Sequence, residues 1–260
     1  MNAVAIRLTA LGALALASAS AHATFFSFAS DSNSQGFTFR GTLGAGTSFN
    51  LINDTVNTFM LRVDDDNRSL PSIEIPVNFV SSLVATPALS FPDPVIPNRF
   101  THVYGVTGSF SFFQQGTGNL LVRVDLGGVT PAVLTVPGSR TAWSTAGAIM
   151  GSDTFTDVTY TATSTLVSLL GGAAAAAQYG VVIPGGMSQA SSTSPDDFAF
   201  DLTVINNGTI GADVALDSNA RPTTAFFSEG SYSGFANIPA PGAAAMLGIG
   251  TLLAARRRRS

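Results

Sequence analysis

The chain has 260 residues, with twelve basic residues that are all arginine, sixteen acidic residues and no cysteine. The lack of cysteine excludes disulfides, thiol nucleophiles and thiolate metal sites. Residues 24–237 hold seven arginines against all sixteen acidic residues, a formal charge of −9 that opposes binding to nucleic acid.

The N-terminus has the pattern of a cleaved secretory signal. Arg7 precedes the apolar run 8–17, and the small-residue stretch that follows ends in Ala21-His22-Ala23. Small side chains at Ala21 and Ala23 fit the pockets of signal peptidase, and the apolar run is shorter than the roughly 20 residues of a membrane span. We expect residues 1–23 to be removed and the protein to be exported.

By their length we expect residues 24–237 to form a single domain, and short alternating apolar and polar runs recur in them. These runs are residues 37–39, 59–63, 73–79, 104–112, 120–126, 158–163, 198–204, 214–216 and 225–227. Clusters of glycine, proline, asparagine and aspartate separate them, as in chains of short strands joined by turns. The pattern predicts an all-β, antiparallel two-sheet β-sandwich, of which a jelly roll is one form.

Three local features refine this prediction. Pro76 lacks an N–H group and predicts that its strand lies at a sheet edge. Residues 206–208, Asn-Asn-Gly, predict a tight hairpin between the strands on either side. Residues 166–179 predict one short helix over an end of the sandwich, because Gly171 and Gly172 interrupt an alanine-rich run.

The densest polar cluster is Asp64-Asp65-Asp66-Asn67. In an extended chain Asp64 and Asp66 point to the same side, and with Asn67 they would offer oxygen ligands to Ca²⁺. The cluster lacks the glycine and the distal glutamate of an EF-hand loop. We therefore favour a solvated turn after the strand 59–63, and expect no cofactor. Asp213 and Asp217 have the same two interpretations.

His102 is the one histidine of residues 24–237. With a serine and an aspartate it would make a general base, but the chain has no Gly-x-Ser-x-Gly nucleophile motif. It also lies in phase with the apolar residues of its strand. We expect a packed histidine and a protein that is not an enzyme.

Large aromatic side chains have two interpretations. Trp143, together with the four tyrosines, would form either a sugar-stacking platform or part of the core, and the core is the interpretation that we favour. The tyrosines are Tyr104, Tyr160, Tyr179 and Tyr232.

The C-terminus combines three ordered elements. Pro239-Ala240-Pro241 precedes the apolar stretch 242–255, and four arginines, Arg256, Arg257, Arg258 and Arg259, stand directly before the last residue. The prolines keep their segment extended, the apolar stretch is short for a membrane span, and the arginines stay on the cytoplasmic side.

This tail resembles the PEP-CTERM sorting signal of exported bacterial proteins, with Ala240 in the place of the usual glutamate. The resemblance covers residues 238–260 and implies a transient contact with the membrane and recognition by an exosortase-like sorting enzyme. Segments 25–31, 63–67 and 226–231 also resemble uncharacterised exported proteins that carry such tails. These proteins imply a location and no activity.

These features predict a non-enzymatic protein of the cell surface or extracellular matrix. Its transient partners would be signal peptidase and an exosortase-like enzyme, and its lasting partner would be extracellular polysaccharide. The alternative is a carbohydrate-binding or Ca²⁺-dependent adhesion module on the same sandwich. A hydrolase would need two carboxylates about 5 to 10 Å apart in a cleft.

Overall fold

The computed structural model describes residues 23–29, 38–44, 46–54, 58–65, 69–127, 130–152, 156–183, 189–192 and 197–236. They form strands that pair antiparallel, together with two short helices, which confirms the predicted all-β class.

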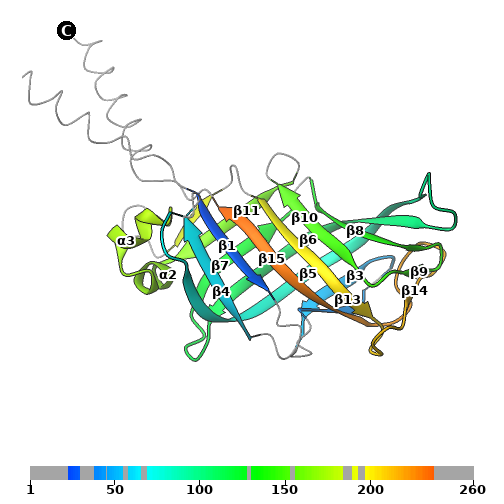
Figure 1. The fold of residues 1–260 in the computed structure, drawn as a ribbon, viewed down its shortest axis with the longest axis horizontal. Coiled ribbons are helices and arrows are strands. Elements are labelled where there is room, and N and C mark those ends of the chain that lie inside the picture. The colour runs from blue at the N-terminus through cyan, green and yellow to red at the C-terminus, as the bar shows by residue number, and fades with distance from the viewer. Residues whose placement is uncertain are drawn as a thin grey trace, which may run out of the picture.

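Two layers of strands face each other across the core. One layer has the order β4 (Thr58–Asp65), β1 (Thr24–Ala29), β15 (Phe226–Ala236), β13 (Asp197–Asn206) and β10 (Gly147–Ser152). The other has the order β5 (Ile73–Pro92), β6 (Phe100–Gln114), β7 (Leu120–Leu126), β11 (Val158–Thr163) and β12 (Gln189–Ser192). Figure 1 shows β1 and β15 crossing in front of β5 and β6, the arrangement of a sandwich.

Pairing of β4 with β5 at one edge, together with the remaining strands, joins the two layers into one continuous hydrogen-bonded ladder. β2 (Phe39–Leu43) and β3 (Phe49–Asn53) connect β15 to β5, and β8 (Ala132–Ser139) connects β10 to β6. β9 (Ala142–Trp143) pairs with β8 and with β14 (Val214–Ala215). These two short strands lie at the end of the molecule that also carries the tip of the β5–β6 hairpin (Figure 1).

The long β5–β6 hairpin changes its neighbours halfway along. Its first half lies between β4 and β7, and its distal half lies between β3 and β8. Gly108 stands where β6 turns from one neighbour to the other, with φ of +120°, and a Cβ there would collide with the carbonyl oxygen of Ser82. Beyond this point the hairpin continues to its tip and forms one wall of the site described below.

The core between the layers is aromatic. Fully or almost fully buried rings come from both layers and contact one another edge to face, tilted or stacked, and they include Phe28, Phe39, Phe79, Phe110, Phe112, Phe200 and Tyr232. Phe200 of β13 is fully buried and makes six such ring contacts among the described residues. The layers are held together mainly by the burial of these rings.

The prediction that Pro76 marks an edge strand is wrong, because β5 pairs with β4 on one side and β6 on the other. The Pro76 carbonyl accepts a hydrogen bond of 3.0 Å from the Gln115 N–H, just after β6 ends at Gln114. The nitrogen and carbonyl of one strand residue point to the same side. The missing N–H of Pro76 therefore falls where the neighbouring strand has ended.

The prediction of a tight hairpin at residues 206–208 is also wrong. β13 pairs with β10 and β15, whereas β14 pairs with β9. The Asn206 side chain closes a local turn instead, since its Nδ2 donates to the Val204 carbonyl at 2.7 Å and its Oδ1 accepts from the Gly208 N–H at 2.8 Å. These local bonds replace hairpin pairing.

The single predicted helix is two, α2 (Ser164–Leu169) and α3 (Ala173–Gln178). Gly171 and Gly172 separate them, with φ of +93° and +94°, values outside the helical range. Tyr179 attaches the helices to the sandwich, because its hydroxyl donates to the Pro71 carbonyl at 2.7 Å and its own carbonyl accepts from Thr24 at 2.8 Å. The helices cover the end of the sandwich opposite the hairpin tip (Figure 1).

Candidate functional site

A hollow of about 960 Å³ lies at the end of the molecule that carries the distal part of the β5–β6 hairpin, where β5 extends past β3. Three parts of the fold line it together with Thr47, namely the hairpin (residues 87–90, Phe100 and His102), the β8–β9 turn (residues 140–141) and the segment 216–220. Sites for small ligands have volumes of roughly 300–1,000 Å³. The hollow is large enough for a ligand of several rings.

His102 forms part of the wall and is 1% exposed, which confirms the prediction of a packed histidine. It lies opposite Ser90 in the β5–β6 register, and its Nδ1 is 2.7 Å from the Ser90 Oγ. Its Nε2 is 2.9 Å from the Ser139 carbonyl oxygen, which can only accept a hydrogen bond. Nε2 therefore carries the proton of the neutral ring, and Ser90 donates to Nδ1.

The Ser90 and His102 pair has the distance of a nucleophile and its base. In a catalytic triad, however, a carboxylate holds the second ring nitrogen and stabilises the imidazolium that forms. A neutral carbonyl takes that position here. The arrangement supports a histidine that fixes the hairpin wall more than one that takes a proton during a reaction.

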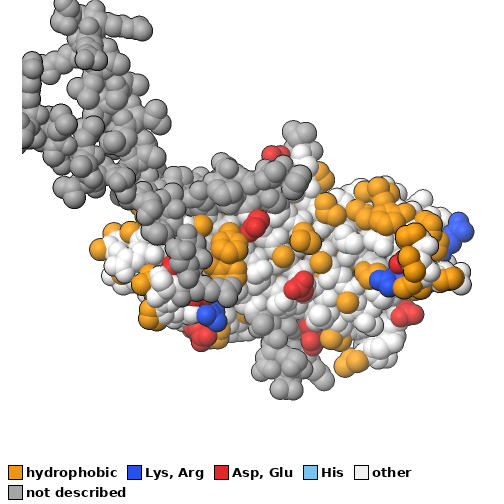
Figure 2. Space-filling model, turned by 45° about the horizontal axis from the view of Figure 1, so that its top comes forward, with side chains coloured by type: hydrophobic (Ala, Val, Ile, Leu, Met, Phe, Trp, Pro, Cys, Tyr) orange, Lys and Arg blue, Asp and Glu red, His pale blue; other side chains and the backbone are white. Residues whose placement is uncertain are grey.

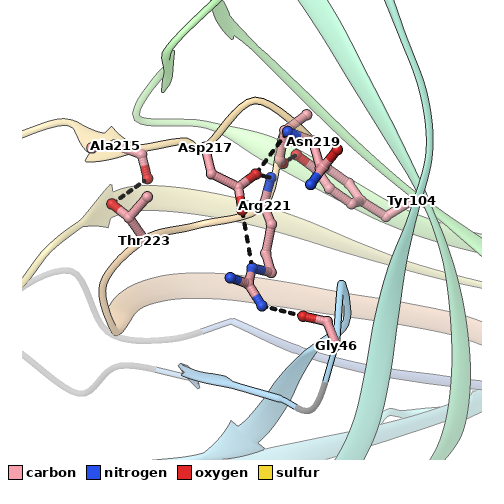
Figure 3. A network of polar contacts seen from close by, with 8 residues as sticks. Gly46, Tyr104, Ala215, Asp217, Asn219, Arg221 and Thr223 are labelled. Carbon is pink, nitrogen blue, oxygen red and sulfur yellow. Dashed lines mark hydrogen bonds and ion pairs between the residues drawn. The ribbon is translucent and has the colours of Figure 1, made fainter.

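The opposite wall is a turn organised by Asp217 (Figure 3). The carboxylate accepts hydrogen bonds from the Asn219 N–H at 2.8 Å, the Arg221 N–H at 3.0 Å and the Arg221 Nε at 3.2 Å. Arg221 also donates to the Gly46 carbonyl, which ties the turn to the loop before β3. The Asp217 carboxylate is therefore occupied inside its own turn.

These contacts lower the pKa of Asp217. The bond from the Arg221 main chain contributes most, partial burial opposes it, and the Asn219 N–H and the Arg221 guanidinium lower the pKa further. The side chain stays ionised at neutral pH and remains paired with Arg221.

The same turn is fixed to the core through Tyr104. Its buried hydroxyl donates to the Ala220 carbonyl at 2.6 Å and accepts from the Trp143 Nε1 at 2.8 Å. Ala220 has a φ of +59°, a left-handed conformation that is costly for a residue with a Cβ. The hydrogen bond from Tyr104 helps to hold this conformation.

Two polar side chains that line the hollow keep free hydrogen-bonding groups. Neither the guanidinium of Arg140 nor the side-chain amide of Asn219 makes a hydrogen bond or ion pair within the part of the chain that the structure describes. Phe100 is half-buried in the wall, with its ring centroid 6.4 Å from that of His102 and the planes within 14°. The hollow thus combines free donors and acceptors with a partly exposed aromatic ring.

The distal part of the β5–β6 hairpin carries exposed apolar side chains. Leu89, Phe91, Val95 and Ile96 are 55%, 44%, 83% and 45% exposed, and Leu89 also lines the hollow. Figure 2 shows hydrophobic side chains gathered at this end of the molecule with basic side chains beside them. A ligand in the hollow would find apolar as well as polar surface.

The sequence did not single out Ser90, Phe100, Arg140 or Asn219. Asn219 and Asp217 stand in a recognisable turn pattern, but the other residues carry no local signal. They meet because four separate parts of the chain converge at one end of the fold.

Trp143 and the four tyrosines belong to the core, as favoured from the sequence. Trp143 is 2% exposed, and the tyrosines, Tyr104, Tyr160, Tyr179 and Tyr232, are at most 8% exposed. The alternative interpretation, in which these rings form a sugar-stacking platform, is wrong. Among the phenylalanine, tyrosine and tryptophan rings of the described residues, that of Phe100 lines the large hollow.

The acidic cluster is only partly within the described residues, since Asp66 and Asn67 lie outside them. Asp64 is 2% exposed in β4 and is paired with the Arg62 Nε at 2.9 Å. Asp65 accepts from Ser69 N and Oγ and from Leu70 N at 2.7–3.1 Å, and the Leu70 bond is the main reason that its pKa is lowered. Asp64 and Asp65 are thus buried strand residues, not the solvated turn that we expected.

No three histidine or acidic side chains of the described residues gather in a group that would hold a metal ion. The structure does not bring Asp64 to the hollow, which lies among other segments.

The residues expected to act in processing lie almost wholly outside the described part of the chain. Ala23 directly precedes β1, whereas Ala21, Pro239, Ala240, Pro241, Arg256, Arg257, Arg258 and Arg259 are not described. Among the described helices, none is long and apolar enough to span a membrane.

Comparison with protein-family models, with curated proteins and with solved structures finds no match for this chain.

Proposed function

We propose that the chain is an exported, non-enzymatic protein of the cell surface or extracellular matrix that binds carbohydrate in the hollow. The observation that carries this proposal is the combination of Phe100 with the free polar groups of Asn219 and Arg140 in one cavity of about 960 Å³. Sugars present apolar ring faces and many hydroxyls, so they need both aromatic contact and hydrogen-bonding side chains.

The walls of the hollow are well suited to binding without catalysis. The β5–β6 ladder supports one wall, and the Tyr104 and Asp217 hydrogen bonds hold the other. Walls whose main chain is held in place before the ligand arrives do not have to be ordered on binding. The neutral carbonyl on His102 Nε2 adds no charge that would drive proton transfer.

Binding is tested by titration calorimetry of the purified full chain against oligosaccharides prepared from bacterial extracellular matrix. We expect Phe100→Ala to weaken binding about 10-fold, by loss of ring stacking, and Asn219→Ala about 2- to 10-fold, by loss of hydrogen bonds. The recovered oligosaccharide should keep its mass, because no bond is broken.

Phe235→Ala and Asn119→Ala are matched controls, since they remove the same side chains from exposed positions outside the hollow. Equal affinity of the parent and both hollow variants would refute binding at this place. Shortened or deacylated oligosaccharide would refute the non-enzymatic role.

The sequences of residues 1–23 and 238–260 support the part of the proposal that concerns delivery to the cell envelope. Intact-mass measurement of the protein from its host should give a chain that begins at Thr24 and ends near residues 239–241. A strain without the sorting enzyme should keep residues 256–259. The same intact C-terminus in both strains would show that the tail is not a sorting signal.

A further inference from the structure

The arginines of the described residues differ in how their charge is satisfied. Four pair with an aspartate, with nitrogen–oxygen distances of 2.7–3.5 Å, namely Arg62, Arg99, Arg123 and Arg221. Arg40 lies over the Phe227 ring, 5.7 Å from its centroid. Among the described arginines Arg140 alone has neither kind of partner.

Arg140 is also the arginine that lines the large hollow. It stands in the tight turn between β8 and β9, where pairing of Ser139 with Ala142 fixes the main chain on both sides of the turn. Its guanidinium is exposed to the hollow and to solvent. A ligand in the hollow can therefore reach its donors without breaking an existing ion pair.

The other charge on the wall of the hollow is compensated. The Asp217 carboxylate is paired with Arg221 and accepts two main-chain hydrogen bonds. Two further polar wall residues, Ser90 and His102, are hydrogen-bonded to each other. The uncompensated charge within the hollow is thus the positive charge of Arg140, although residues 24–237 carry a formal charge of −9.

We infer that the hollow selects carbohydrate that carries carboxylate groups, with Arg140 as the residue that recognises them. This inference rests on the proposed carbohydrate binding and names its ligand class. The planar guanidinium offers parallel N–H donors that match the two oxygens of a carboxylate, and such charge-assisted bonds are stronger than those to a sugar hydroxyl. Phe100 and Asn219 would contact the sugar ring and its hydroxyls.

The test compares an oligogalacturonate with its carboxyl-reduced counterpart, which has the same length and linkages but no charge. Calorimetry with the full chain should show 10- to 100-fold tighter binding of the oligogalacturonate, the range for hydrogen bonds to a charged group. Arg140→Gln should remove this preference, so that the variant binds the two sugars with similar affinity. Arg140→Lys should keep part of it, since a lysine retains the charge without the planar fork.

Arg123→Gln is the matched control, because it removes the same charge from a strand outside the hollow. It changes the net charge of the protein as much as Arg140→Gln does, so only a local contact separates the two variants. The preference of the parent should also fall with added salt, since the charge of Arg140 is exposed to screening.

Equal affinity of the parent for the two sugars would overturn the inference and leave the proposed carbohydrate binding standing. If Arg140→Gln still preferred the oligogalacturonate to its reduced counterpart, Arg140 would not be the residue that recognises the carboxylates, and the inference would be overturned. If neither sugar nor any matrix oligosaccharide binds, the proposed function fails together with the inference.

Discussion

Replacement of Phe200 by alanine is expected to lower the free energy of unfolding by about 3–5 kcal/mol, the range for loss of a buried phenylalanine ring. Phe200 is fully buried and contacts rings from β1, β2, β5, β6 and β15 as well as Phe198 of its own strand. Its removal leaves a cavity at the place where both layers meet. Urea unfolding, followed by tryptophan fluorescence, measures the loss.

Two variants make this result specific. Phe200→Leu keeps most of the buried volume and should cost less than half as much. Phe91→Ala removes a ring that is 44% exposed and should change the unfolding free energy by about 0.5 kcal/mol or less. Similar losses in Phe200→Ala and Phe91→Ala would contradict the position of the aromatic core.

Replacement of Tyr104 by phenylalanine is expected to cost about 1–3 kcal/mol, because it leaves the Trp143 N–H buried without its acceptor. The Ala220 carbonyl loses its donor at the same time. Tyr179→Phe is the matched control. Its hydroxyl donates to the exposed Pro71, where water can replace it, so we expect a loss of about 0.5–1.5 kcal/mol.

A double variant separates the hydrogen bond from other effects. Adding Trp143→Phe to Tyr104→Phe removes the donor that Tyr104→Phe leaves without an acceptor. The losses of unfolding free energy in the two single variants should therefore sum to more than the loss in the double variant. Strictly additive losses would show that Trp143 and Tyr104 do not depend on each other.

The pH dependence of the unfolding free energy at alkaline pH gives a second test of the buried Tyr104 hydroxyl. Burial raises the pKa of its hydroxyl above the ordinary value of 10.0, the Asp217 charge acts in the same direction, and the Trp143 bond opposes both. The unfolded chain releases this proton near pH 10, whereas the folded protein holds it to higher pH. This contribution to stability is therefore complete below pH 10 and is lost as the pH rises through the folded pKa.

The slope follows from linkage. Above about pH 10 the parent should lose up to roughly 1.4 kcal/mol per pH unit more than Tyr104→Phe does. Parallel stability curves for the two proteins between pH 9 and 12 would contradict the buried, protonated state of this hydroxyl.

Alternation along single strands could be predicted from the sequence. In β7 the buried Val122, Val124 and Leu126 alternate with Arg123 and Asp125, as expected for a half-buried strand. The same holds for the first half of β5. Alternation is a local property, because successive strand side chains point to opposite faces whatever their neighbours are.

Strands made of small residues were largely missed. β15 extends from Phe226 to Ala236, whereas the sequence pattern predicted a strand only over residues 225–227. Glycine and serine there resemble loop composition. The fold uses them for space, since a Cβ at Gly234 would collide with the hydroxyls of Tyr160 and Tyr232, which are 2.8 Å apart. Tyr160 is distant from Gly234 in sequence, so no local pattern reveals the requirement.

The sequence by itself therefore determined the all-β class and the buried faces of the alternating strands, and it favoured a core position for the large aromatic rings. Each follows from the alternation of side chains along a strand and from their hydrophobicity, which are properties of a few consecutive residues. Only the tertiary structure decided that β5 lies between two neighbours despite Pro76 and that Ser90 meets His102. It also decided that Arg140 lines a hollow without an acidic partner, because strand pairing brings together residues far apart in the chain.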